Sequence, residues 1–395
     1  MATSIWIFWL LAFILLYTYA GYAILLWVVA KIHSWTNPTP SNMEKLPGEL
    51  PAVTIVVAAY NEKAVVSQKI CNIKQLSYPP EKVFQLWVTD GSTDGTVEAL
   101  KAYPEVDIVH HAERLGKAEA INRAMKLVKT PVTVFSDANT IVEPTSLTEI
   151  VKPLADSRTG GVAGEKRILY RRTGNPTSTG EGIYWRYESF VKSMESKTGS
   201  TISAAGELFA IKTDLFTPIP PDTLLDDFEI SSRIILGGHR VKYSRNAVAS
   251  EYGSLNFYEE MKRKVRIAAG GFQSLFRNLQ LLNPFPHPGY TFKYFSHKVL
   301  RWAFAPACLF LLPVFNAIIV ASQSENPLYL LSLIILLTFF LVGLFGHLAR
   351  NSKAFPHLMF LPYYAILMNI SQIIGFIKFI QHKHNPKWDK SKRET

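Results

Sequence analysis

FQLWVTDGSTDGT, residues 84–96, is the stretch that decides the fold of this 395-residue chain. Its first six residues predict a strand that runs directly into Asp90. The turn that follows combines glycines, which accept unusual φ angles, with hydroxyl and carboxylate groups that can cap a helix. Two interpretations stay open at this point: a capped strand-to-helix turn, or a ligand-binding turn at the end of a strand.

The same alternation of strands and helices extends on both sides of this stretch. Strands are predicted at 53–59, 84–89, 106–110 and 132–136, and helices after the first strand, at 96–103 and at 116–128. This order predicts an α/β fold with a mainly parallel sheet, in which ligands bind at the carboxyl ends of the strands. Because Asp90 and Asp137 each directly follow a strand, we expect both to lie at one rim of the sheet.

Two further acidic motifs occur in the same block. FSDANT places the oxygens of Asp137 and Asn139 on one side of an extended tripeptide, where they can hold a hard divalent ion. LLDDFEIS puts Asp226 and Asp227 at the predicted start of a helix. Adjacent side chains diverge, so one carboxylate can cap the helix while the other faces a cleft and acts as a base.

Membrane-length apolar runs flank this block at 5–30, 302–322, 327–349 and 358–380. Each is long enough, as a helix, to cross roughly 30 Å of hydrocarbon. The first run lacks a preceding basic residue and exceeds a typical signal core, so a retained anchor is predicted. The last is the least apolar, and it either crosses the membrane or dips into it without crossing.

The net charge of +11 indicates contact with anionic lipid rather than with nucleic acid, because it accompanies apolar spans. Basic residues after the first span place the central block in the cytoplasm. Cys71 and Cys308 offer neither a disulfide framework nor a metal cluster, which fits a reducing compartment. We therefore expect a multi-pass protein of the bacterial inner membrane.

Six motifs resemble, in order, those of the membrane-bound glycosyltransferases of family 2, which include cellulose, chitin, hyaluronan and poly-N-acetylglucosamine synthases. They are VVAAYNE (56–62), VTDGSTDGT (88–96), GKAEAINRAM (116–125), SDAN (136–139), GEL (206–208) and LLDDFEIS (224–231). The resemblance covers roughly residues 52–300. It implies a GT-A-like, Rossmann-type cytosolic domain flanked by one N-terminal and two to three C-terminal transmembrane helices.

This resemblance sets the expected domain organisation. The order is an N-terminal transmembrane helix at 1–30, a Pro-rich linker at 31–51, the GT-A glycosyltransferase domain at 52–255, amphipathic interfacial helices at 256–301, a C-terminal transmembrane region at 302–380 and a basic tail at 381–395. The basic residues of 256–282 are expected to face lipid, Arg266 excepted. The aromatic stretch 184–188 is interpreted as a core-facing or interfacial helix in preference to an acceptor path.

The resemblance also implies which residues contact the nucleotide of a UDP-sugar donor. Tyr60, Asn61, Glu62 and Asp90 would contact the uridine, and Lys117 would lie near the nucleotide. UDP-N-acetylglucosamine and UDP-glucose are the leading donors on this basis. The acceptor would be a glycan or a lipid-linked sugar, and export or assembly proteins are further candidate partners.

A second group of residues carries the implied chemistry. Asp137 and Asn139 would hold Mg²⁺ or Mn²⁺ against the diphosphate, and Arg266 would pair with the diphosphate. Asp227, with Asp226 beside it, would be the general base of an inverting transfer.

Three departures from the family pattern keep alternatives open. Thr89 replaces the first Asp of the usual DDGS, Asn139 replaces a second metal-site Asp, and Ile267 replaces the Trp of QxxRW. These changes motivate a rival hypothesis, a non-catalytic membrane subunit of a polysaccharide assembly or export complex. Loss of the Trp also leaves both processive synthesis and single addition open.

Overall fold

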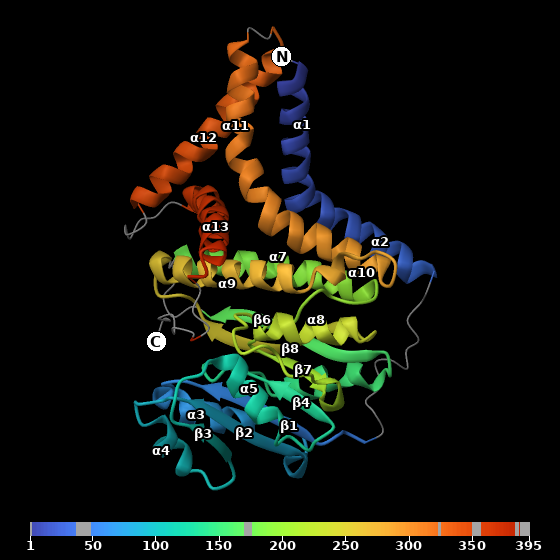
Figure 1. The fold of residues 1–395 in the computed structure, drawn as a ribbon, viewed down its shortest axis with the longest axis vertical. Coiled ribbons are helices and arrows are strands. Elements are labelled where there is room, and N and C mark those ends of the chain that lie inside the picture. The colour runs from blue at the N-terminus through green and yellow to red at the C-terminus, as the bar shows by residue number, and fades with distance from the viewer. Residues whose placement is uncertain are drawn as a thin grey trace.

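The computed structural model describes residues 2–36, 49–169, 176–322, 325–349, 357–383 and 387. Figure 1 shows three levels: a sheet with its own helices, a layer of long helices above it, and apolar helices that rise from this layer. Most of the predicted linker (37–48) lies outside the described residues. The same is true of most of the predicted tail, 384–395, apart from residue 387.

Within the described residues, one eight-stranded sheet forms the base of the molecule. Its strands are β1 (Val53–Ala59), β2 (Val83–Asp90), β3 (Asp107–His111), β4 (Val132–Phe135), β5 (Ile141–Val142), β6 (Thr159–Leu169), β7 (Phe209–Lys212) and β8 (Arg240–Tyr252). Their order is β3-β2-β1-β4-β7-β6-β8-β5. The first four are all parallel, as the strand–helix alternation predicts.

The second half of the sheet contains both parallel and antiparallel strand pairs. The sequence predicted a mainly parallel sheet and gave no sign of the antiparallel pairs. β7 runs antiparallel to β4, with Phe209 opposite Phe135 and Lys212 opposite Val132. The chain enters β7 from the carboxyl end of β4, so it must run in the opposite direction. β6 then pairs with β7 antiparallel and with β8 parallel.

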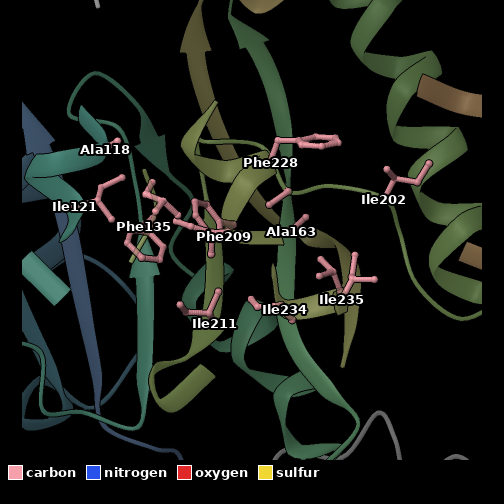
Figure 2. Packing of buried hydrophobic residues seen from close by; sticks show 14 of the residues in the cluster. Ala118, Ile121, Phe135, Ala163, Ile202, Phe209, Ile211, Phe228, Ile234 and Ile235 are labelled. Atoms are coloured by element: carbon pink, nitrogen blue, oxygen red, sulfur yellow. The ribbon is translucent and has the colours of Figure 1, made fainter. Parts of the chain in front are cut away.

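Helices cover the sheet and bury both of its faces. They are α3 (Lys63–Lys74), α4 (Thr96–Lys101), α5 (Lys117–Met125), α6 (Ser146–Val151) and α8 (Asp226–Leu236). On β1, Val56 belongs to one buried cluster and Val57 to another, which is why this strand is apolar apart from Thr54. Figure 2 shows Phe135 and Phe209 together near Ile121; the two phenyl rings stack with centroids 4.6 Å apart.

The middle layer consists of α7 (Pro176–Lys197), α9 (Phe257–Arg277) and α10 (Pro288–Tyr294). The expectation that the basic residues of α9 face lipid is wrong for Arg263 and Lys264, which are buried. Arg263 donates to Glu181 of α7 and to Glu260, and Lys264 pairs with Glu260 at 3.5 Å. These carboxylates compensate the cost of burying both cations.

Four helices of the described residues are long and apolar enough to cross a membrane: Ala2–Thr36, Pro288–Ala321, Pro327–Ala349 and Leu361–Ile380. By length and composition, these helices agree with the membrane protein that the apolar runs predict. The first helix joins α1 (Ala2–Leu16) and α2 (Tyr22–Thr36) through a π-helical turn, so it extends beyond the predicted residue 30.

The second apolar helix is also longer than predicted. It runs from α10 through a π-helical segment, Phe295–Phe304, into α11 (Ala305–Ala321). The other two are α12 (Pro327–Ala349) and α13 (His357–Ile380). Within α13, Phe376 packs on Phe272 of α9 with ring centroids 4.8 Å apart, so the last apolar helix rests on the middle layer.

Candidate active site

A cavity of about 280 Å³ lies between the carboxyl ends of the parallel strands and the middle helix layer. Its walls come from the loop after β4, residues 203–207, the start of α8, and the helices α7, α9 and α13. The π-helical segment of the second apolar helix completes the wall. One cavity therefore joins the strand ends to helices that belong to the membrane-spanning part.

Asp137 and Asn139 both line this cavity, in the loop after β4. The Asp137 Oδ1 atom accepts a hydrogen bond from Lys117 Nζ at 3.0 Å. Beneath the loop, the buried Lys69 ammonium donates to Ser136 Oγ and to the Thr140 carbonyl at 2.8 and 2.9 Å. Burial lowers the pKa of Lys69 to about 7. This lysine fixes the loop that presents Asp137 and Asn139.

Lys117, the first residue of α5, joins the Asp137 loop to the start of α8. Its ammonium lies 3.0 Å from Asp137 Oδ1 and 3.3 Å from Asp226 Oδ2. Burial alone would lower the pKa of Lys117, but Asp137 and Asp226 outweigh burial and raise it above its usual value. Lys117 is therefore a permanent positive charge between two of the predicted acidic positions.

Asp226 and Asp227 are the first two residues of α8. The N-cap residue is Leu225, so the interpretation of Asp226 as an N-cap is wrong; its carboxylate pairs with Lys117 instead. Burial, followed by repulsion from Asp226, raises the pKa of Asp227 to about 7, although Lys117 opposes the shift. A carboxylate with this pKa is suited to general base catalysis near neutral pH.

The three groups converge around Gly206 of the GEL motif. A Cβ atom at Gly206 would lie 3.6 Å from Lys117 Nζ, 3.7 Å from Asp227 Oδ2 and 3.9 Å from Asp137 Oδ2. The absence of a side chain at this position leaves space between the two carboxylates. The strand-end rule predicted that Asp137 would lie at this rim, and the structure brings Asp227 to the same point.

Asp90 occupies a different place from the one its predicted role suggests. It is fully buried, and its carboxylate accepts hydrogen bonds from the backbone N–H groups of Leu115 and Gly116, at 3.2 and 2.7 Å, and from Arg123 at 2.9 Å. In this structure Asp90 holds the start of α5. Its contact with uridine stays a prediction. Thr89, which replaces the first Asp of the family motif, bonds to His110 Nδ1 at 2.8 Å.

The YNE motif is tied to the turn after β2. The Asn61 backbone N–H donates to Ser92 Oγ at 3.1 Å, and Asn61 Oδ1 accepts from the Thr93 N–H at 2.8 Å. The Arg114 guanidinium stacks 3.8 Å above the Tyr60 ring, a flat surface of the kind on which a base can stack. Arg114 was missed because it lies in a loop without a motif.

The remaining predicted residues, Glu62 and Arg266, line the cavity, with Ile267 beside Arg266. The aromatic stretch belongs to α7, and Tyr184, Trp185 and Glu188 line the cavity, so the interfacial helix and the acceptor path both stay open as interpretations. Sequence reasoning missed other residues that line the cavity, among them Lys192, Lys298, Arg301, Trp302 and Gln372. They were not singled out from the sequence, because their place in the cavity depends on how their helices pack.

The donor atoms fit a metal ion that is shared with a substrate. Among the described residues, no group of three or more His, Cys, Asp or Glu side chains could hold a metal ion alone. Asp137 and Asn139 offer a carboxylate and an amide oxygen, and Mg²⁺ is commonly held by one or two carboxylates together with substrate phosphates. The pair therefore suits Mg²⁺ or Mn²⁺ bound with a diphosphate, and does not suit a permanent metal centre.

Comparison with known proteins agrees with this geometry. Residues 54–216 match the family model described as Glycosyl transferase family 2. The chain is 25% identical over 267 residues to poly-beta-1,6-N-acetyl-D-glucosamine synthase of Staphylococcus aureus (strain COL), covering 64% of this chain and 63% of the relative. The Staphylococcus epidermidis enzyme of the same name is 22% identical over an alignment of the same length. The alignment thus spans 63% of the length of these curated relatives.

The fold also matches a solved structure, the mannosyltransferase PcManGT from Pyrobaculum calidifontis in complex with GDP-Man and Mn²⁺. The TM-score is 0.71 at 23% identity, over 96% of this chain and 99% of that chain. The fold is therefore of the GT-A type, with apolar helices at the N- and C-terminal ends that are long enough to span a membrane. Residues 54–216 thus resemble the family 2 glycosyltransferases, and the chain is similar to poly-beta-1,6-N-acetyl-D-glucosamine synthases.

Proposed function

We propose that the protein transfers a sugar from a UDP-sugar to a polysaccharide or lipid-linked acceptor, with inversion at the anomeric carbon. The observation that carries this proposal is the convergence of Asp227 and Asp137 beside Gly206, within one cavity. N-acetylglucosamine and glucose are the leading donor sugars, and the names of the staphylococcal relatives favour N-acetylglucosamine.

Each polar residue then has a task in the reaction. The donor diphosphate lies against Lys117, Asp137 and Asn139, with Arg266 pairing with its oxygens. Mg²⁺ or Mn²⁺, when bound there, neutralises charge on the departing UDP. Asp227 takes the proton of the acceptor hydroxyl as this hydroxyl attacks the anomeric carbon from the face opposite UDP.

At the nucleoside end, we propose contacts from Tyr60, Asn61, Glu62 and Asp90. Support comes from the Arg114–Tyr60 stack, which provides a planar surface, and from the hydrogen bonds that fix Asn61 beside the turn after β2. Asp90 would act on this site through the start of α5, since its carboxylate is already bonded there.

We further propose that the catalytic domain faces the cytoplasm from the bacterial inner membrane. The basic residues that follow the first span support this orientation, because positive charge is retained on the cytoplasmic side. Membrane lipid would surround the spans, and export or assembly proteins are candidate partners. Nucleic acid is not a proposed ligand.

The pH dependence of the transfer tests the role of Asp227. Because its pKa is raised to about 7, we expect kcat/KM to fall about tenfold per pH unit below pH 7, as the base becomes protonated. Asp226→Asn removes the repulsion that contributes to the shift, so the acid limb should move to lower pH. The measurement is kcat/KM from pH 5 to 9. A flat profile would argue against Asp227 as the base.

UDP release from UDP-N-acetylglucosamine and UDP-glucose by membrane vesicles tests the proposal as a whole. We expect metal-dependent release with one donor, and labelled product of defined size. Polymer would indicate processive synthesis, and a single added sugar would indicate a lipid glycosyltransferase. No release, together with no metal-dependent UDP binding by calorimetry, would favour the non-catalytic subunit that Thr89, Asn139 and Ile267 motivate.

A further inference from the structure

The cavity carries opposite charges at its two ends. Carboxylates surround Lys117 at the strand end, where Asp137, Asp226 and Asp227 lie. Cations line the end formed by α7, α9 and the second apolar helix, and these are Lys192, Lys264, Lys298 and Arg301. The strand end is therefore suited to a metal–diphosphate complex and a base. The other end is suited to a negatively charged group.

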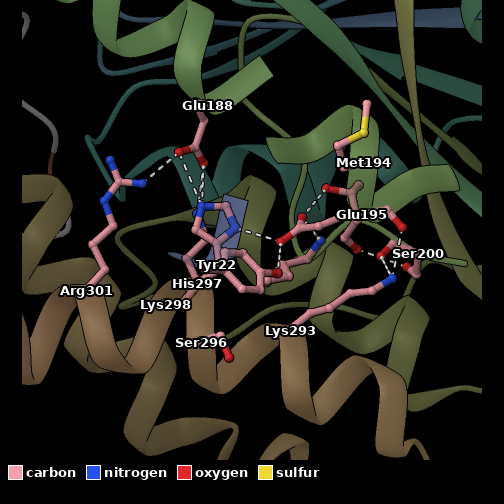
Figure 3. A network of polar contacts seen from close by, with 12 residues as sticks. Tyr22, Glu188, Met194, Glu195, Ser200, Lys293, Ser296, His297, Lys298 and Arg301 are labelled. Carbon is pink, nitrogen blue, oxygen red and sulfur yellow. Dashed lines mark hydrogen bonds and ion pairs between the residues drawn. The ribbon is translucent and has the colours of Figure 1, made fainter. Parts of the chain in front are cut away.

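At this cationic end, the Glu188 carboxylate is shared among several cations. Glu188 accepts from Lys298 at 3.1 Å and from Arg301 at 2.9 Å, and it also contacts His297, as Figure 3 shows. The Lys264 and Arg301 groups both lie over the Tyr184 ring, 4.2 and 5.1 Å from its centroid. Lys264 and Arg301 thus share the Tyr184 ring. The nearby Glu188 carboxylate bonds to Arg301 and is also shared with Lys298 and His297.

Lys192 is the cation with the least compensation. Its side chain is only 4% exposed, and its ammonium has no hydrogen bond or ion pair within the described part of the chain, only a position 5.7 Å above the Trp185 ring. Burial lowers the pKa of Lys192. Glu188 opposes this shift without bonding to the ammonium. A buried ammonium without a directly bonded carboxylate is costly, and an anionic ligand would reduce that cost.

Two neutral groups at the same end also lack partners. Trp185 Nε1 and Gln372 Oε1 are buried and make no hydrogen bond to the described residues. An indole N–H suits a phosphate or sugar oxygen, and an amide oxygen suits a sugar hydroxyl. The unsatisfied groups therefore match a ligand that carries both an anion and hydroxyl groups.

The position of this end indicates where the ligand comes from. Lys298, Arg301 and Trp302 belong to the apolar helix Pro288–Ala321, and Gln372 belongs to Leu361–Ile380. Both helices are long and apolar enough to cross a membrane. A ligand that reaches the cationic end along these helices arrives from the lipid phase, whereas the nucleotide sugar arrives from water.

We propose that the cationic end of the cavity binds the phosphate or diphosphate of a lipid-linked acceptor, with Lys192 as its main ligand and Lys264 and Arg301 beside it. This proposal rests on the proposed glycosyl transfer and selects the lipid-linked acceptor over a free glycan. The acceptor sugar would then extend from its phosphate toward Gly206 and the Asp227 carboxylate.

The test compares two acceptors with the full-length protein in neutral-lipid nanodiscs, using UDP-N-acetylglucosamine. One acceptor is N-acetylglucosamine on a long-chain prenyl diphosphate, and the other is its octyl glycoside. We expect the diphosphate acceptor to have a KM roughly 10- to 100-fold lower, the range of a hydrogen bond to a charged group. Inorganic diphosphate should inhibit transfer to the octyl glycoside, which separates recognition of the phosphate from recognition of the lipid.

Lys192→Met then tests the assigned residue. The variant should lose the preference for the diphosphate acceptor, because its KM for this acceptor should rise to that for the octyl glycoside. Its melting temperature without ligand should be equal or higher, because an uncompensated buried charge has been removed. Lys197→Met, at the exposed end of α7, is the matched control and should leave both acceptors unchanged.

Several results would overturn the proposal. They are equal KM values for the two acceptors in the wild type, an increase in donor KM in Lys192→Met, or a lower melting temperature with equal losses on both acceptors. In each case, metal-dependent transfer to the octyl glycoside would leave the proposed function intact. Absence of UDP release with either acceptor and without acceptor would instead count against the proposed function itself.

Discussion

Asp227→Asn should reduce kcat by about 10²- to 10⁴-fold, the contribution typical of a positioned general base. The amide keeps the size of the side chain and cannot accept the proton of the attacking hydroxyl. Metal-dependent UDP binding should survive, because Asp137, Asn139 and Lys117 are unchanged. The measurements are steady-state transfer and calorimetric titration with UDP.

The stability of this variant separates a catalytic role from a structural one. The pKa of Asp227 in the fold, about 7, lies above its ordinary value of 3.8, so the fold favours the protonated form. The fold therefore loses stability as pH rises from 3.8 to about 7, and above this range the loss is constant. Asp227→Asn removes this loss, and its melting temperature at pH 8 should be equal or higher. Asp222→Asn is a matched control at a carboxylate 58% exposed, paired with Arg277.

Removal of the metal should abolish transfer, and Mg²⁺ or Mn²⁺ should restore it. Asp137→Ala should be inactive even at high metal concentration, since a metal-held diphosphate accounts for several kcal/mol of charge stabilisation. Asn139→Asp adds a negative charge to the pair and should lower the half-saturating metal concentration by about tenfold. The measurements are transfer rates after treatment with EDTA and during metal titration.

The outcome at Asn139 distinguishes two explanations of this departure from the family pattern. Tighter metal binding with retained transfer would show that the amide already occupies a ligand position. Unchanged metal dependence in Asn139→Asp would contradict a role of residue 139 in metal binding. Full activity in EDTA would contradict the metal-dependent mechanism as a whole.

The first half of the fold was predictable because its signals are local. β1, β2 and β4 are short, largely apolar runs, and the helices α4 and α5 begin at recognisable glycine turns. β6 gives no such signal, because it contains Lys166, which is buried. Lys166 pairs with Glu207 and Glu251, which are distant in sequence, so nothing near it indicates that its charge is compensated.

The residues of the candidate site also fall into two groups: some were predictable from local sequence, and others depend on tertiary packing. Asp137 was placed at the rim because it ends a strand, and Asp227 by the resemblance of its motif. The bonding of Asp90 depends on Arg123 and on the backbone of Gly116, which become neighbours only when α5 packs. Lys192 has no motif at all, and its burial under the second apolar helix is a property of the tertiary structure.

The contact between Glu195, Glu188 and His297 has a consequence for how the chain folds. Both carboxylates lie on α7 and are buried, and His297 of the second apolar helix bonds to Glu195 at 2.8 Å and to Glu188 at 3.3 Å. Tyr22 of the first apolar helix donates to Glu195 at 2.8 Å. Without these helices, Glu188 would lose its bonds to His297, Lys298 and Arg301, and Glu195 would keep, among the described residues, only those to Thr201 and to the Ile202 N–H. The globular part and its anchors therefore form one cooperative folding unit, and insertion into the bilayer is a step in the maturation of the active site.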